Sequence, residues 1–219
     1  MFPQQPQQQF RTSGADVQFF YGTDATTGGV TTLKQSWNKP VGVSHIYMML
    51  IGGGGVGDGT FGGGSGAVTV WYGAAQYVPN SLVITNSVGD STNTTVSYYA
   101  KTTTILLTAA GAVGSTGGLA MTANQFTASG FFQSVQGQQG SSSGVSASST
   151  TFLGGGAANT SVTGNYGYTN SANGYFQLQP IIVGLGCATA NKPGIGCGNG
   201  ASNGLNNNGG TGFVLIASW

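Results

Sequence analysis

The chain has 219 residues, of which 41 are glycine and only 4 % are charged, and its net charge is +1. Five scattered cations cannot neutralise a run of phosphates, so this composition excludes a nucleic-acid partner. Glutamate is absent and lysine and arginine are scarce, which argues against an α-rich fold because these residues commonly fill the exposed positions of helices.

The chain opens with an arm, residues 1–14, that is rich in glutamine and proline. These residues offer little apolar surface, so we expect the arm to be ordered by a neighbouring subunit rather than by a core of its own. Residues 15–219 then form one domain, because 39 % of the chain is hydrophobic and can fill a core. The opening lacks a signal-peptide pattern and no apolar run approaches the ~20 residues of a membrane span, so we expect no membrane partner.

Two strand-like runs, Asp16–Tyr21 and Val30–Trp37, precede the most informative stretch of the sequence, residues 37–72. In that stretch an apolar run at 41–51 and a second run, Ala67–Tyr72, flank two clusters of glycine. Apolar and β-branched residues on both sides of a glycine cluster predict two strands joined by a tight or closely packed connection.

The glycine clusters themselves favour a structural interpretation. Gly52, Gly54 and Gly57 match the spacing of a dinucleotide site, but neither a helix nor an acidic residue about twenty positions on follows them, so we expect no cofactor. Because glycine has no side chain, backbones can approach closely and pair their amides, as they do at the axis of collagen. The glycines to which we assign this role are Gly52, Gly53, Gly54, Gly55, Gly57, Gly62, Gly63 and Gly64.

The rest of the chain continues the β pattern. Runs at 81–88, 95–98 and 102–109 are typical of antiparallel strands with one buried face. Residues 111–164 are dominated by small and polar residues, which predicts surface loops and short edge strands. The last run, Phe213–Ile216, is apolar on both faces and should be central or interfacial. These patterns predict an all-β fold with less than roughly 10 % helix: an antiparallel β-sandwich with glycine-rich loops, for which a jelly roll is the candidate form.

Residues that could carry catalysis are few. The sequence holds one histidine, His45, and four isolated aspartates, which supply neither a nucleophile–base pair nor the two converging carboxyls of a glycosidase. We therefore expect no enzymatic activity and no metal site. Cys187 and Cys197 flank a glycine-rich turn, and this spacing leaves two states open, a disulfide or two reduced thiols.

A tyrosine-bearing stretch precedes the two cysteines. Tyr166, Tyr168 and Tyr175 lie among serine, asparagine and glycine, a composition typical of adaptable recognition surfaces and equally of subunit interfaces. Phe213 and the final residue, Trp219, are the other side chains that we assign to an interface or a recognition surface.

The stretch from Trp37 also carries a family resemblance. It reads Trp-Asn-Lys-Pro-Val-Gly-Val, then a strand ending Ile-Gly-Gly-Gly-Gly, then Gly-Gly-Gly-Ser-Gly and a Val-Thr-Val strand, and Gly212–Trp219 reads as a closing strand. These motifs, which span roughly residues 35–120 and 184–219, resemble the glycine-rich domain found in bacteriophage tail and tail-fibre proteins.

The resemblance implies a non-enzymatic structural protein that is located in the virion. Its partners would be copies of itself, which a net charge near zero favours, and other virion proteins. Three versions of this role stay open. The first expectation is a subunit of a tail fibre or surface appendage. The alternatives are a small jelly-roll capsid subunit and an adhesin whose glycine-rich loops and tyrosines attach to a host receptor or glycan.

Overall fold

The computed structural model describes residues 14–22, 32–57, 60–87, 92–140, 195–196 and 209–219. Within these ranges the chain forms nine strands and two short 3-10 turns, and no α-helix. The strands are β1 (Asp16–Tyr21), β2 (Thr32–Asn38), β3 (His45–Ile51), β4 (Val68–Ala74), β5 (Ser81–Ser87), β6 (Thr94–Tyr99), β7 (Thr103–Ala109), β8 (Gly130–Val135) and β9 (Phe213–Ser218). The turns are η1 (Ala75–Tyr77) and η2 (Thr127–Ser129).

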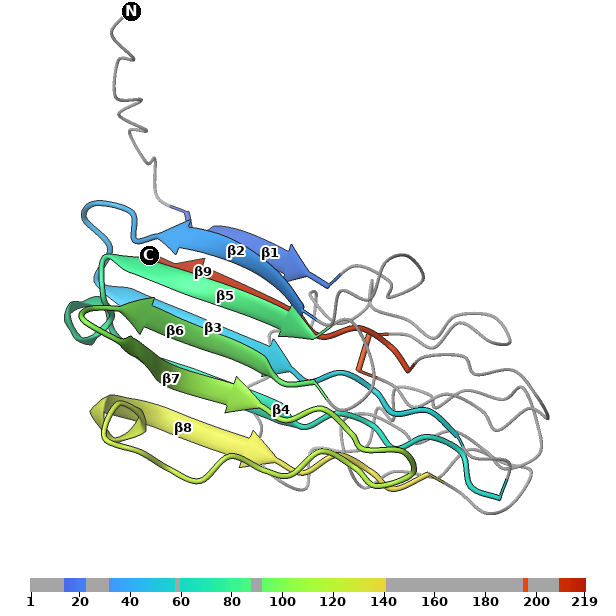
Figure 1. Ribbon diagram of the computed structural model, residues 1–219. Helices are drawn as coiled ribbons and strands as arrows, with labels where there is room; N and C mark the ends of the chain where they lie inside the picture. The colour runs from blue at the N-terminus through green and yellow to red at the C-terminus, as the bar shows by residue number, and fades with distance from the viewer. Residues whose placement is uncertain (1–13, 23–31, 58–59, 88–91, 141–194, 197–208) are drawn as a thin grey trace, which may run out of the picture.

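The strands form two antiparallel sheets that pack against each other (Figure 1). One sheet has five strands in the order β1-β9-β3-β4-β8, and the other has four in the order β2-β5-β6-β7. In Figure 1 the four-stranded sheet lies in front, and the connections that follow β3 and precede β4 and β9 extend from one end of the sandwich. This arrangement confirms the predicted all-β sandwich, and its jelly-roll form stays a prediction.

Strand β9 is an interior strand of the five-stranded sheet and lies between β1 and β3. Its residues Phe213–Ser218 pair with Asp16–Tyr21 on one side and with Ile46–Ile51 on the other, and all six are buried. A strand that is paired at both edges and covered on both faces needs apolar side chains on both faces. The double-sided apolar pattern of Phe213–Ile216 therefore reflects the central position.

The predicted strand boundaries agree with the structure at β1 and differ by one to four residues at β2 to β7 and β9. Strand β4 continues past Tyr72 to Ala74, because Gly73 is paired with Ile46 on one side and with Gly130 on the other. Strand β8 lies within residues 111–164, where the sequence predicted surface loops and short edge strands, and it forms an edge of the five-stranded sheet as predicted.

A hydrophobic core fills the space between the two sheets. Each sheet contributes the inward-facing residues of its strands, and burying one large apolar side chain contributes roughly 1.5–3 kcal/mol to stability. The fully buried large members of this core are Trp37, Ile46, Met48, Leu50, Trp71, Leu82, Ile84, Leu107 and Ile216.

A second apolar cluster lies on the opposite face of the five-stranded sheet. It contains buried residues of β3, β4 and β9, and the partly buried Val70 and Ile195 pack against it. Its buried members are Tyr47, Met49, Ile51, Val68, Phe213, Leu215 and Ala217. Both faces of the central strands are therefore apolar, and any polar group placed there is removed from water.

Tyr47 is such a group, and burial raises the pKa of its phenol from 10.0 to about 12. The unfolded chain ionises this phenol near its ordinary pKa, whereas the folded protein keeps it neutral. The contribution of this phenol to the free energy of unfolding is therefore present below pH 10 and is lost as the pH rises from 10 to about 12. We expect the free energy of unfolding to fall over this window by about 2 kcal/mol more in the wild type than in Tyr47→Phe, as measured by urea denaturation. The same pH dependence in both proteins would contradict this assignment.

Candidate functional site

Glycine-rich segments gather at the end of the sandwich where β3 leads to β4 (Figure 1). The segments that form this glycine bundle are 52–57, 62–67, 110–118, 137–140, 195–196 and 209–212. Backbone hydrogen bonds join them: the N–H of Gly55 donates to the Gly64 carbonyl at 2.8 Å, and the N–H of Gly64 donates to the Gly114 carbonyl at 2.9 Å. The bundle is therefore held mainly by main-chain groups, and the Ser65 hydroxyl adds one side-chain bond by accepting from the Gln138 N–H at 2.7 Å.

Residues 62–67 lie at the centre of the glycine bundle. The N–H of Ser65 donates to the Gln138 carbonyl and the N–H of Gly66 donates to the Gly196 carbonyl, both at 2.8 Å. The bonds of this segment reach four others: 52–57, 110–118, 137–140 and 195–196. A strand in a sheet has only two neighbours, one at each edge. Four neighbours indicate that the segments pack around one another, as the chains of collagen pack around their axis.

Side chains are excluded inside the glycine bundle. A Cβ atom on Gly52 or Gly118 would overlap the carbonyl oxygen of Ala110, and a Cβ atom on Gly66 would overlap the carbonyl oxygen of Gly52. A neighbouring carbonyl thus faces the Cα of each of these glycines, which is the arrangement of weak Cα–H···O contacts between close backbones. Close approach of the backbones is what requires glycine at these positions.

The glycines to which the sequence assigned a structural role lie in two segments of the bundle. At Gly52, Gly55 and Gly64 a backbone carbonyl occupies the space where a Cβ atom would sit. The Gly53 carbonyl accepts a hydrogen bond from the N–H of Ala112, and the N–H of Gly54 donates to the Gly210 carbonyl. The remaining three lie in the same two segments: Gly57, Gly62 and Gly63.

Sequence reasoning missed other glycines of the bundle. Gly66, Gly118 and Gly137 are equally crowded by neighbouring carbonyls. Gly118 and Gly137 stand among serine, threonine and glutamine instead of in long glycine runs, so composition gives them little signal. Among the described bundle residues Gly114 and Gly196 have positive φ, at 54° and 69°, and these two are required by backbone conformation.

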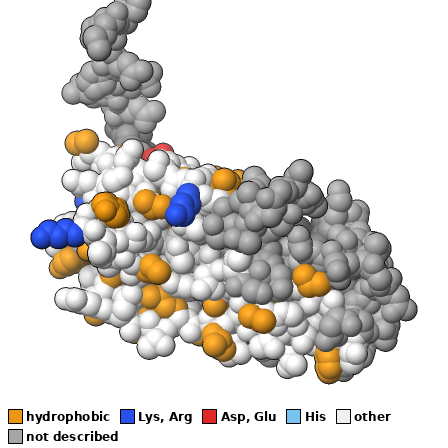
Figure 2. All heavy atoms as spheres, in the orientation of Figure 1, with side chains coloured by type: hydrophobic (Ala, Val, Ile, Leu, Met, Phe, Trp, Pro, Cys, Tyr) orange, Lys and Arg blue, Asp and Glu red, His pale blue; other side chains and the backbone are white. Residues whose placement is uncertain are grey.

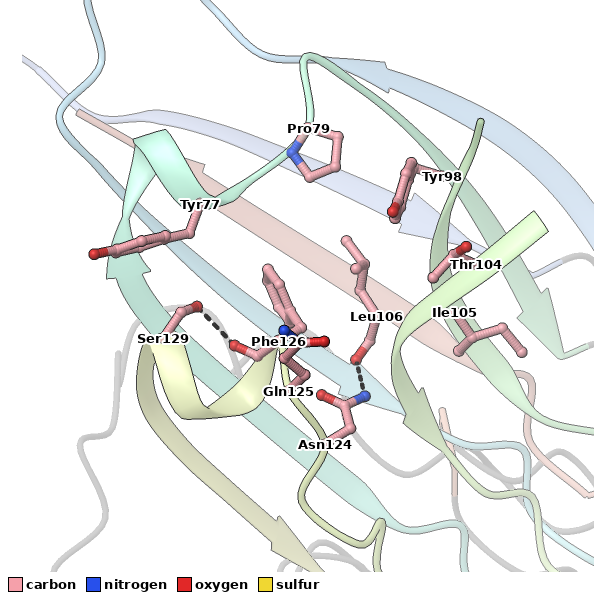
Figure 3. Close-up of a pocket in the computed structure, with 10 residues that line it drawn as sticks. All are labelled: Tyr77, Pro79, Tyr98, Thr104, Ile105, Leu106, Asn124, Gln125, Phe126 and Ser129. Atoms are coloured by element: carbon pink, nitrogen blue, oxygen red, sulfur yellow. Dashed lines mark hydrogen bonds between the residues drawn. The ribbon is translucent and has the colours of Figure 1, made fainter. Parts of the chain in front are cut away.

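A pocket of about 430 Å³ opens on the side of the sandwich (Figure 3). Figure 3 shows Phe126 and Leu106 at the centre of its lining, while Tyr77 and Ile105, each about half exposed, form part of its rim. The volume falls within the range of small-molecule pockets. The ten lining residues are Tyr77, Pro79, Tyr98, Thr104, Ile105, Leu106, Asn124, Gln125, Phe126 and Ser129, and none of them is charged.

Lys39 fixes the wall of the pocket that carries Tyr77 and Pro79. Its Nζ atom donates to the carbonyl of Ala75 at 3.0 Å and to the carbonyl of Val78 at 2.7 Å. These two carbonyls lie at the start of η1 and just after it, so one ammonium group holds the whole turn through charge-assisted hydrogen bonds. The lysine of the Trp-Asn-Lys-Pro motif therefore supports a wall of the pocket.

The opposite wall is held by Asn124. Its Nδ2 atom donates to the Leu106 carbonyl at 3.0 Å, and its Oδ1 atom accepts from the backbone N–H of Thr127 at 2.9 Å. The Phe126 ring packs on the buried indole of Trp71, with 4.7 Å between the ring centroids. These contacts tie η2 both to β7 and to the core, so the pocket is formed before any ligand binds.

Three aromatic side chains form a second exposed feature, at the end of β3 opposite the glycine bundle. We call His45, Tyr72 and Trp219 the aromatic corner. Their ring centroids are 5.7–6.3 Å apart and their planes are within 20° of parallel. Tyr72 is 36 % and Trp219 42 % exposed, and Phe131, which lies opposite Tyr72 on β8, is 51 % exposed. This corner leaves a large aromatic area in contact with water.

Phe213 and Trp219, which the sequence assigned to an interface or recognition surface, differ in their exposure. Trp219 lies at the surface in the aromatic corner, whereas Phe213 is fully buried and its ring contacts those of Phe19 and Tyr21 on β1. Phe213 therefore has no surface to offer a partner in this conformation. The other predicted residues lie outside the described ones: Tyr166, Tyr168, Tyr175, Cys187 and Cys197, together with residues 1–13 of the arm.

Over the described ranges, histidine, cysteine, aspartate and glutamate do not gather in groups of three or more that could hold a metal ion. No helix in the same ranges has the length and apolarity needed to cross a membrane. Comparison of the sequence with known families found no matching family model. A comparison with curated proteins found no match either.

Proposed function

We propose that this chain is a non-enzymatic structural subunit of a virus particle, in a tail fibre or surface appendage. The observation that carries the proposal is the glycine bundle. Its segments 52–57, 62–67 and 209–212 fall in the same regions as the motifs that resemble the glycine-rich domain of phage tail proteins. The described bundle segments contain no charged residue, and they pair their backbone groups with one another. Such a module suits a rigid part of an assembly.

The aromatic corner and strand β1 supply surfaces for contact between subunits. Tyr72, Trp219 and Phe131 are exposed together at one end of the five-stranded sheet, and Phe19 and Tyr21 are exposed along its β1 edge. Aromatic residues are enriched at protein interfaces, and an exposed edge strand can pair with another chain. Figure 2 shows few charged side chains among the described residues on one face, and a net charge of +1 removes most of the repulsion between copies.

Electron microscopy of purified particles tests the proposal. Antibodies raised against the full chain should label an appendage, and the chain should be present in the particles at constant stoichiometry. Labelling spread over the shell would favour the capsid alternative. Absence of the chain from purified particles would refute a virion role.

Attachment to a host surface is the second candidate, and the pocket favours it. The pocket is open to solvent, uncharged and held in shape by Lys39 and Asn124, as a ligand-binding site requires. An attachment protein would retain particle assembly but lose adsorption when the pocket is altered. A purely structural subunit would retain both assembly and adsorption.

A further inference from the structure

The pocket between β7 and the two 3-10 turns has a lining that selects the chemistry of its ligand. We propose that it binds a neutral saccharide, with one sugar ring of a glycan seated against Tyr77 and Phe126. This inference does not depend on the virion proposal, because it concerns a site formed by this chain alone. It rests on three properties of the lining: its lack of charge, its aromatic faces and its unpaired polar groups.

The absence of charge in the lining argues against an anionic ligand. None of the ten lining residues is ionisable at neutral pH, and the one cation that supports a wall, Lys39, already donates to two carbonyl oxygens. A phosphate, a carboxylate or an acidic sugar would lose its hydration here without gaining an opposite charge. A neutral ligand loses much less hydration free energy when it enters such a pocket.

Aromatic side chains line the pocket from three different parts of the fold. Tyr77 comes from η1, Tyr98 from β6 and Phe126 from the residue before η2 (Figure 3). Tyr77 is 52 % exposed, so part of its surface can contact a ligand without any rearrangement. The C–H groups on the face of a sugar ring are apolar, and large rigid side chains such as tyrosine cover such a surface at low entropic cost.

The polar groups of the lining divide into two sets. Asn124 and Ser129 are used inside the protein, since they donate to the carbonyls of Leu106 and Phe126 at 3.0 and 2.6 Å (Figure 3). A second set makes no side-chain hydrogen bond within the described part of the chain: the hydroxyls of Tyr98 and Thr104 and the amide of Gln125.

This second set suits the edge of a sugar ring, where hydroxyl groups both donate and accept hydrogen bonds. Tyrosine and threonine hydroxyls and a glutamine amide also do both, so they can pair with a sugar hydroxyl in either sense. An apolar side chain from a neighbouring protein would leave these three groups without a hydrogen-bond partner. The lining therefore favours a saccharide over an apolar protein anchor.

Saturation-transfer NMR on the full chain tests the proposal with defined probes: maltotriose, lactose, a trisaccharide of N-acetylglucosamine, and sialyllactose as the acidic counterpart of lactose. We expect at least one neutral probe to receive saturation, and sialyllactose to bind no better than lactose. Tyr77→Ala should weaken binding of that neutral probe about tenfold, because the ring face is lost. Tyr77→Phe, which keeps the ring, should retain most of the affinity.

Two further variants make the result specific to the pocket. Thr104→Trp places a bulky ring at an exposed β7 position of the lining and should block binding, with the melting temperature as a check on folding. Tyr99→Ala is the matched control, because Tyr99 is 72 % exposed on β6 but does not line the pocket, and it should bind as the wild type does. No binding of any neutral probe would overturn the proposal. So would binding that survives Tyr77→Ala, or a Tyr77→Ala variant that loses only self-association.

Discussion

Gly66→Ala and Gly118→Ala should each destabilise the protein by about 3 kcal/mol, the upper part of the range for forcing extra atoms into a packed interior. The added Cβ atom would meet the backbone of Gly52 in the first case and of Ala110 in the second. Backbone atoms of a hydrogen-bonded bundle cannot turn aside as the end of a flexible side chain can. For a chain of this length the loss corresponds to a fall in melting temperature of roughly 6–12 °C, measured by calorimetry.

Gly42 provides the matched control for these two variants. It has a φ of +81°, and no atom lies within 4 Å of the position of an added Cβ. Asparagine tolerates this left-handed conformation, so Gly42→Asn should change the melting temperature little. If Gly66→Ala and Gly118→Ala have the same melting temperature as Gly42→Asn, the glycines are not needed for close approach of the backbones and the bundle is an ordinary loop.

The second large effect concerns Trp71, whose fully buried indole lies over two paired glycines, Gly73 and Gly130. A Cβ atom on Gly73 would come within 2.5 Å of the Cζ2 atom and 2.7 Å of the Cη2 atom of that ring. We expect Gly73→Ala to destabilise the protein by about 2–3 kcal/mol, because the surrounding core leaves the indole no room to shift.

A double-mutant cycle separates this contact from any effect of alanine on the strand that does not depend on Trp71. Trp71→Leu alone should cost about 3 kcal/mol through the space it leaves in the core. In that background Gly73→Ala should be nearly neutral, since its methyl group then enters the vacated space, and the coupling free energy should exceed about 1 kcal/mol. Additive losses of free energy in urea denaturation would contradict a direct contact between Trp71 and residue 73.

Much of the sandwich could be predicted from the sequence, because its strands have strong local patterns. The run Asp16–Tyr21 gives β1 its observed bounds, and the double-sided apolar pattern of Phe213–Ile216 indicates the central strand. The pattern failed where glycine lies inside strands. Gly73 reads as a strand end, but it continues β4 because Trp71 covers it, and Gly130 begins β8 opposite it for the same reason.

The pocket could not be predicted, because no local spacing encodes it. Its walls depend on contacts between residues far apart in the sequence, such as the Lys39 ammonium with the carbonyl of Val78 and the Asn124 amide with the carbonyl of Leu106. The apolar pattern of Phe213–Ile216 left open whether this strand is central or interfacial, and the rings of Phe19 and Tyr21 in the neighbouring strand are among the side chains that contact Phe213.

Amide hydrogen exchange tests the glycine bundle most directly, because the bundle consists of backbone hydrogen bonds. The N–H groups of Gly54, Gly64, Gly66 and Gly118 donate to the carbonyls of other segments at 2.8–2.9 Å. We predict that these four amides exchange as slowly as the amides of β3 and β9, and that they open together with the sandwich. Rapid exchange at these glycines while β3 and β9 stay protected would show that the glycine-rich segments do not form the bundle.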